Sequence, residues 1–170
     1  MYLENNQVKR YPIRIILSWT AVVIWMAVIF AFSHQTSDQS GKLSLTLADN
    51  LVRLFDKQAS LATVMQVDGI LRDIAHGGIF FILGLLTCWA FSEMGSPELR
   101  NALLTFILCA LYAASDELHQ AFIPGRAGQW YDYLIDLAGI TLAIALYQIV
   151  TTLRYLREDL RVKREEDLRV

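Results

Sequence analysis

Four long apolar runs alternate with polar segments along the chain, and their lengths predict membrane-spanning helices. The runs cover about residues 13–33, 74–91, 101–120 and 130–150. Each is close to the roughly 20 residues that an α-helix needs to cross the hydrocarbon core of a bilayer. The pattern predicts an all-α polytopic membrane protein, built as a bundle of four transmembrane helices in one domain over residues 1–150.

Between the first two runs, apolar residues recur at helical spacing within a polar segment. The recurring positions are Leu43, Leu47, Leu51, Leu54 and Phe55. This spacing predicts an amphipathic helix that lies along the membrane surface or across the end of the bundle. A second short helix is expected over residues 61–71. The segment could serve structural packing or act as a lid over a substrate, and both readings stay open.

Composition and charge agree with a membrane protein and narrow its partners. Hydrophobic residues make up 55% of the chain, which is above the usual share in soluble domains. The formal net charge of −2 gives no indication of a nucleic-acid partner. The first run is preceded by basic residues, as in a signal peptide, but its length and the absence of a small-residue cleavage pattern after it favour a retained span. Cys88 and Cys109 each lie in an apolar run, which predicts buried thiols rather than a disulfide.

Lysine and arginine residues outside the spans predict the orientation. With four spans, both ends of the chain and the loop between the second and third spans share one side, which holds ten of these residues against five on the other. Because cytoplasmic loops carry the excess of basic residues, both termini are expected in the cytoplasm. The charged tail, residues 151–170, is expected to be a solvated cytoplasmic helix.

A polar stretch between the last two runs places ionisable side chains inside the membrane. It reads DELHQAFIPGRAGQWYDYLID over residues 116–136. The uninterrupted apolar part of the third span, residues 102–114, covers only about 20 Å of a hydrocarbon core about 30 Å thick. The polar residues that complete this span therefore fall within the outer leaflet. Aromatic residues mark the interface of the fourth span, and Asp136 falls about one turn below it.

The polar side chains of the four spans should meet. Ionisable groups at this depth cost several kcal/mol unless they are paired or face water. On the third span Asp116 and Gln120 share a face, and on the fourth Asp132, Asp136 and Gly139 do so. A short turn joins these spans, so the two faces can pack together, and glycine permits close approach. The other two spans add polar groups at their outer ends: Ser33 and Gln35 on the first, Arg72 and His76 on the second.

These residues form one candidate site with several readings. The candidates for acid–base or other catalytic chemistry are Asp116, Glu117, His76 and Asp132. The candidates for substrate binding are Arg126, Gln120, Asp136, Arg72, Ser33 and Gln35. No cofactor is identified, but a divalent metal could be held by oxygen ligands from Asp116, Glu117, Asp132 and Asp136. In a purely structural reading, Asp116 and Glu117 pair with Arg126 or Arg72, and His76 is a packing residue.

One motif resembles a known family. DELHQAFIPGR at residues 116–126, followed by Asp132, Asp136 and Gly139, resembles the VanZ-like family of bacterial membrane proteins, and FSHQTSDQS at residues 32–40 and the region of His76 add weaker matches. The resemblance covers about residues 13–150. It implies a bacterial cell membrane and an association with resistance to teicoplanin, a lipoglycopeptide that acts on cell-wall precursors at the outer face. It names a process and not a reaction.

The chain also departs from the family pattern near His76. The family often has lysine three residues before this histidine and tyrosine four residues after it, where this chain has Asp73 and Phe80. Arg72 could supply the missing cation. Asp136 stands where asparagine is common in the family.

Three functions follow as expectations. The first is a site for an amphiphile with an anionic head, such as a membrane lipid, a lipid-linked wall precursor or a lipoglycopeptide, with or without turnover. The second is a non-enzymatic binding or accessory protein. The third is a small transporter, which the confinement of the polar groups to one leaflet disfavours. The oligomeric state is open.

Overall fold

The computed structural model describes residues 11–125 and 128–168, with side chains described for all of these except residues 37–40 and 166. This part of the chain is all-helical, with five helices and no strand. In order they are α1 (Pro12–Ser33), α2 (Ser37–Phe55), α3 (Leu61–Glu93), α4 (Glu98–Gln120) and α5 (Trp130–Asp167). All except α2 are long and apolar enough to cross a membrane. The predicted fold class is therefore confirmed.

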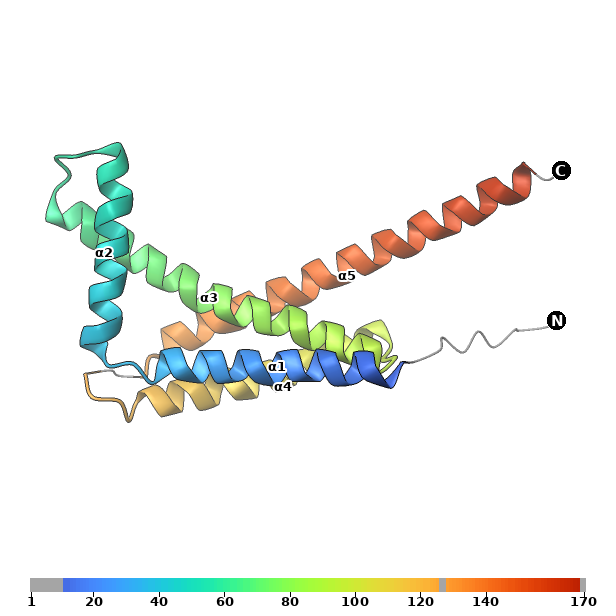
Figure 1. Ribbon diagram of the computed structural model, residues 1–170, viewed down its shortest axis with the longest axis horizontal. Helices are drawn as coiled ribbons and strands as arrows, with labels where there is room; N and C mark the ends of the chain where they lie inside the picture. Colours follow the sequence, from blue (N-terminus) through green and yellow to red (C-terminus); the bar gives the residue numbers. More distant parts are fainter. Residues whose placement is uncertain (1–10, 126–127, 169–170) are drawn as a thin grey trace.

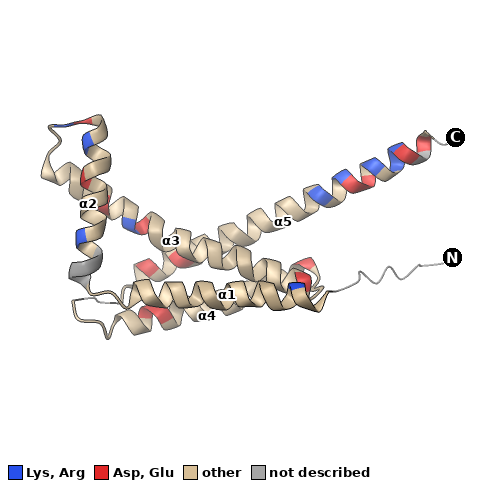
Figure 2. Ribbon diagram, in the orientation of Figure 1, with Lys and Arg blue, Asp and Glu red and all other residues tan. Residues whose placement is uncertain are grey.

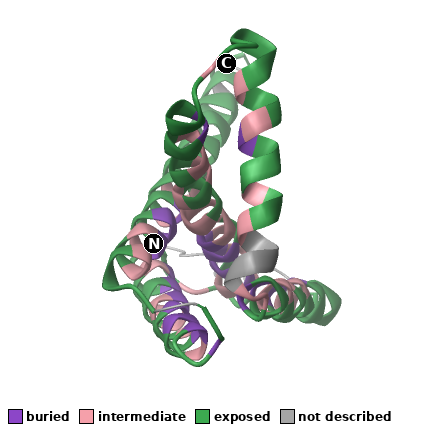
Figure 3. Cartoon of the chain, turned by 90° about the vertical axis from the view of Figure 1, so that its left-hand side faces the viewer, coloured by how far each residue is buried: buried purple, intermediate pink, exposed green. Residues whose placement is uncertain are grey.

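The helix α3 is at the centre of the arrangement and contacts each of the other four helices (Figure 1). Its buried residues Phe80 and Leu83 pack in a core with Val22 and Ile29 of α1 and Ile140 of α5. Exposed residues occupy much of the outer helix faces (Figure 3), and many of them are large and apolar. Apolar outer faces of this kind suit contact with lipid chains.

Close backbone approach distinguishes the crossing of α3 and α5. A Cβ added at Gly139 would overlap the carbonyl oxygen of Gly77 and would lie 2.9 Å from its carbonyl carbon. Further along the same two helices, a Cβ at Gly84 would lie 2.8 Å from the Cβ of Ala143. Glycine lets two helix backbones touch where any side chain would separate them. The predicted role of Gly139 in close packing agrees with this contact.

The helix α2 has the predicted amphipathic character and lies across one end of the bundle (Figure 1). It packs against α3, and its residue Ala48 is fully buried. Leu54 and Phe55, at its end, are largely exposed. The helix α2 therefore forms a wall at one end of the bundle. The described residues of the polar stretch, 116–125 and 128–136, lie at the same end (Figure 1).

Two helices are longer than the apolar pattern predicts. The expected short helix over residues 61–71 and the expected span over residues 74–91 form the single helix α3, and no proline interrupts the backbone between them. Its start is capped by Ser60, whose Oγ accepts a hydrogen bond from the backbone N–H of Thr63. The helix α5 likewise continues through most of the charged tail.

Charged side chains avoid the middle of the bundle. Figure 2 shows them near the ends of the bundle and along the C-terminal part of α5. In that tail, Lys163 pairs with Asp159 at 2.8 Å and Arg161 with Glu165 at 3.4 Å, both at i,i+4 spacing. Such exposed pairs support a solvated helix by a few tenths of a kcal/mol each.

Candidate functional site

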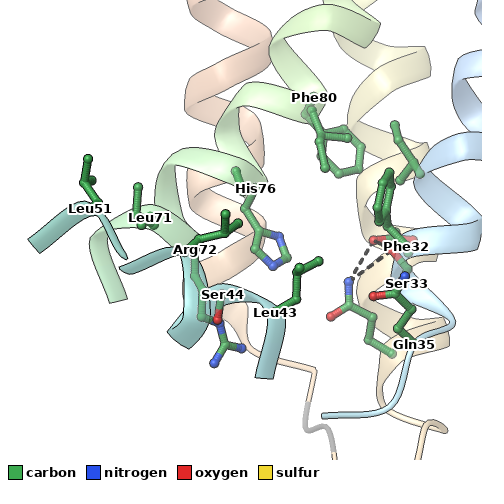
Figure 4. A pocket seen from close by; sticks show the side chains of 16 residues that line it. Phe32, Ser33, Gln35, Leu43, Ser44, Leu51, Leu71, Arg72, His76 and Phe80 are labelled. Atoms are coloured by element: carbon green, nitrogen blue, oxygen red, sulfur yellow. Dashed lines mark hydrogen bonds between the residues drawn. The ribbon is translucent and has the colours of Figure 1, made fainter. Parts of the chain in front are cut away.

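A groove of about 600 Å³ opens where α2 crosses the end of the bundle. Its volume lies in the usual range for small-molecule sites, about 300 to 1,000 Å³. One wall is made by Leu43, Leu47 and Leu51, which lie at helical spacing on α2. Figure 4 shows Leu43 and Leu51 on this side, with Phe32 and Phe80 across the groove. The walls are therefore almost entirely apolar.

The opposite part of the groove has a polar floor that joins α1 to α4. Ser33 donates a hydrogen bond from Oγ to Oδ2 of Asp116 at 2.8 Å, and Gln120 donates from Nε2 to the same oxygen at 2.9 Å. Gln120 Nε2 also lies 3.4 Å from the Ser33 Oγ. All three side chains are buried and line the groove. Asp116 and Gln120 share a face of α4, as their i,i+4 spacing predicts.

The rim of the groove carries the positive charge. Arg72 lines the groove and is exposed, and its guanidinium lies beside Ser44, away from Phe80 (Figure 4). Gln35 also lines the groove, beside Ser33 and across from Arg72 (Figure 4). Among the described lining residues, Arg72 is the only one with a guanidinium or ammonium group. The lining thus combines an apolar trough, a buried carboxylate and one exposed cation.

His76 connects the groove to a second, deeper cluster. It lines the groove from α3, and its Nδ1 lies 3.7 Å from Oδ1 of Asp136 on α5, longer than a hydrogen bond. Glu117 of α4 completes the cluster: one ligand atom from each of the three residues lies within 4.8 Å of the others. We call His76, Glu117 and Asp136 the deep cluster.

The carboxylates of the deep cluster are poorly satisfied. Oε2 of Glu117 accepts a hydrogen bond from the backbone N–H of Gln129 at 2.9 Å. Oε1 of Glu117 and both carboxylate oxygens of Asp136 are buried and have no hydrogen-bond partner in the described part of the chain. Asp136 is 0% exposed. Burying carboxylate oxygens without partners costs free energy, so this arrangement requires an explanation.

Two glycine contacts hold the deep cluster together. The contact between Gly77 and Gly139 lies next to His76 and one turn from Asp136, so it fixes these two side chains against each other. A Cβ added at Gly128 would lie 2.7 Å from the backbone oxygen of Glu117, so the segment before α5 also packs tightly on α4. The cluster is therefore set by the fold and not by flexible side chains alone.

The structure divides the predicted site residues into these two groups. Ser33, Gln35, Arg72, His76, Asp116 and Gln120 line the groove, and Glu117 and Asp136 lie in the deep cluster with His76. Asp132, one turn before Asp136 on α5, is half-buried and is not one of the three grouped ligands. Of the four carboxylates considered for a metal, two are therefore grouped. Arg126 lies outside the described residues.

The separation of Asp116 from Glu117 has a simple cause. Neighbouring residues on a helix point about 100° apart, so the two carboxylates face different parts of the site. Asp116 faces α1 and the groove, whereas Glu117 faces α5. The ion pair between Asp116 and Arg72 that a structural reading allowed is not among the described contacts, where Asp116 accepts from Ser33 and Gln120 instead.

Sequence reasoning missed several parts of the site. It did not assign Phe32 and Phe80 to the groove, nor did it pair His76 with Asp136. It also missed a histidine pair: His34, directly after α1, stacks on His119 of α4, with His34 Nδ1 at 3.3 Å from His119 Nε2. The only signal in the sequence for these pairings is that the polar residues lie near the same end of each span. Which residues face each other is decided by helix packing, which the sequence pattern does not show.

Comparison with known proteins identifies one family. A model of the VanZ/LLP1 family matches residues 18–151, which include all five helices at least in part and both groups of site residues. No curated protein and no solved structure matches the chain.

Proposed function

The chain belongs to the VanZ/LLP1 family, and on this premise we propose that it binds an amphiphile with an anionic head from the cell envelope. The groove carries the proposal, because it joins apolar walls to a polar floor within one cavity. Leu43, Leu47 and Leu51 would contact an acyl chain. A membrane lipid, a lipid-linked wall precursor and a lipoglycopeptide such as teicoplanin all have this division into chain and head.

The polar residues of the groove suit such a head group. The exposed guanidinium of Arg72 would bind a phosphate or carboxylate at the rim. Asp116 is held in place by Ser33 and Gln120 and would accept a hydrogen bond from a hydroxyl or amine of the head. Gln35 adds an amide to the lining on the side of Ser33 (Figure 4). Arg126, in the PGR motif that resembles the family, is still predicted from the sequence to be a second anion-binding group.

Binding without turnover is the simplest function of this geometry, but one observation favours catalysis. His76 lines the groove and lies 3.7 Å from a carboxylate oxygen of the buried Asp136. A histidine that lies beside a carboxylate and is open to a substrate is a common general acid or base. Turnover of a wall precursor by the wild type and not by His76→Gln would support this second function. Equal turnover by both would exclude His76 as the acid or base.

We place the groove at the outer face of a bacterial cell membrane, with both termini in the cytoplasm. The excess of basic residues on the side of the termini supports this orientation. The acidic floor and the deep cluster lie at the opposite end of the bundle from the start of α1. Alkaline phosphatase fused after residue 168 should be inactive, because it folds only outside the cytoplasm; an active fusion would reverse the orientation.

Antibiotic susceptibility tests the proposed function in cells. In a sensitive Gram-positive host, the protein should raise the inhibitory concentration of teicoplanin at least about fourfold. Vancomycin, which lacks an acyl chain, should be little affected. Asp116→Asn and Glu117→Gln should each lose protection at equal membrane levels, whereas Asp159→Asn on the exposed tail should keep it.

Each outcome of this test has a separate meaning. Protection by the wild type and by Asp159→Asn alone would support a role of the acidic residues. Equal protection by all variants would make Asp116 and Glu117 structural. No protection by any form would remove teicoplanin as the ligand and direct attention to other envelope lipids.

A further inference from the structure

We propose that the deep cluster binds a divalent cation of the Mn²⁺ or Zn²⁺ type, through the imidazole of His76 and the carboxylates of Glu117 and Asp136. This inference goes beyond the proposed function, because the groove can bind an amphiphile with or without a cation. The three ligands come from three different helices, α3, α4 and α5. A bound cation would therefore also tie these helices together.

The spacing of the ligand atoms fits a shared cation. The three atoms lie within 4.8 Å of one another, and the His76 Nδ1 to Asp136 Oδ1 distance is 3.7 Å. A cation about 2.1 Å from each ligand separates neighbouring ligands by roughly 3 to 4 Å. The pair at 3.7 Å already has this separation, and the widest one needs only a small side-chain rotation.

The unpartnered oxygens point independently to a ligand. Both carboxylate oxygens of Asp136 are buried, the residue is 0% exposed, and neither oxygen has a hydrogen-bond partner among the described residues. Oε1 of Glu117 is also buried and has no hydrogen-bond partner among the described residues. Buried acceptors normally find partners, and buried charges normally pair or coordinate a metal. Three such oxygens beside one imidazole nitrogen are the environment that a cation would satisfy.

Charge balance supports the same conclusion. The ion pairs of the described residues give Asp136 only His76 as a partner and give Glu117 none. Two carboxylates close together within the membrane repel each other and are poorly hydrated. A divalent cation neutralises both at once.

The donor set selects the class of cation. An imidazole nitrogen favours first-row transition metals and zinc, whereas calcium and magnesium prefer oxygen ligands alone and more of them. Three protein ligands also leave at least one position for a water molecule or a bound ligand, as in catalytic metal sites. Because His76 also lines the groove, such a position would adjoin the proposed amphiphile.

His34 and His119 form the main alternative metal site, so the control variants must include one of them. His34 and His119 approach within 3.3 Å, but no carboxylate is grouped with them among the described residues. Exposed acids of the tail could also bind metal weakly. Variants must therefore distinguish the deep cluster from both.

The test uses the full chain purified in detergent, stripped with EDTA and titrated with Mn²⁺, with bound metal followed by electron paramagnetic resonance. We expect one tight site per chain in the wild type. Asp136→Asn and Glu117→Gln should each weaken Mn²⁺ binding at least about tenfold, equal to about 1.4 kcal/mol. His34→Ala and Asp159→Asn should bind as the wild type does. Imidazole nitrogen coupling to the bound Mn²⁺ should vanish in His76→Gln.

Other results would overturn the proposal. Absence of a tight site in the wild type would do so, for Mn²⁺ and then for Zn²⁺ measured by elemental analysis. So would wild-type affinity in Asp136→Asn, or loss of the site in His34→Ala. Circular dichroism must show equal helicity in every variant, and thermal stabilisation of the wild type by Mn²⁺ gives a second readout. Because this test measures bound metal and not bound lipid, failure of the metal site leaves the proposed function of the groove standing.

Discussion

Gly139→Ala should prevent normal packing of the bundle and lower its stability by about 3 kcal/mol or more. The new Cβ would overlap the carbonyl oxygen of Gly77, which is backbone and cannot rotate away. The helices α3 and α5 would have to separate at their closest contact. Since α3 contacts every other helix, the change would loosen the whole core.

Reaction of the two cysteines measures this effect. Cys88 and Cys109 are about 1% and 0% exposed, so a maleimide should label them slowly in the folded wild type. Gly139→Ala should label much faster and unfold at a lower temperature. Gly78→Ala is the matched control, because a Cβ there has no neighbour within 4 Å and alanine favours the helix. Wild-type labelling in Gly139→Ala would show that α3 and α5 do not touch as described.

Asp136→Asn should stabilise the protein by about 2 kcal/mol when divalent cations are removed. The wild-type carboxylate is fully buried and has no hydrogen-bond partner in the described part of the chain. A neutral amide of nearly the same size avoids the cost of burying that charge. A gain in stability is unusual for such a change, since most substitutions at buried positions destabilise a protein.

Thermal unfolding in detergent with EDTA measures this difference. The control is Asp132→Asn, one turn away on the same helix, where the side chain is half-buried and the effect should be small. A lower unfolding temperature for Asp136→Asn than for the wild type would mean that the carboxylate is satisfied. In that case the carboxylate oxygens of Asp136 would no longer be an argument for a bound cation.

The helices could be predicted because their signals are local. Run lengths near 20 apolar residues predicted the four spans, and the leucine spacing of residues 43–54 predicted α2. The same logic placed Asp116 and Gln120 on one face, where they share a hydrogen bond. The apolar pattern does not predict the continuity of α3, because apolar character drops near Arg72 and Asp73 although no proline ends the helix there.

The arrangement of the site could be predicted only in part. Depth in the membrane indicated that polar groups of all four spans would meet, and most of them do. It could not tell that His76 faces Asp136 while Asp116 faces Ser33, because the register of α3 against α5 depends on the contact of Gly77 with Gly139. Periodicity within one helix carries no information about the facing helix.

Lipid that co-purifies with the protein tests the claim that the groove holds an amphiphile. Mass spectrometry of wild type in mild detergent should find about one retained envelope lipid per chain. Leu47→Trp should lose most of it, because the larger ring occupies the groove wall. Leu54→Trp, on the same helix but 79% exposed and outside the groove lining, should retain it. Equal retention by Leu47→Trp and wild type would contradict the claim.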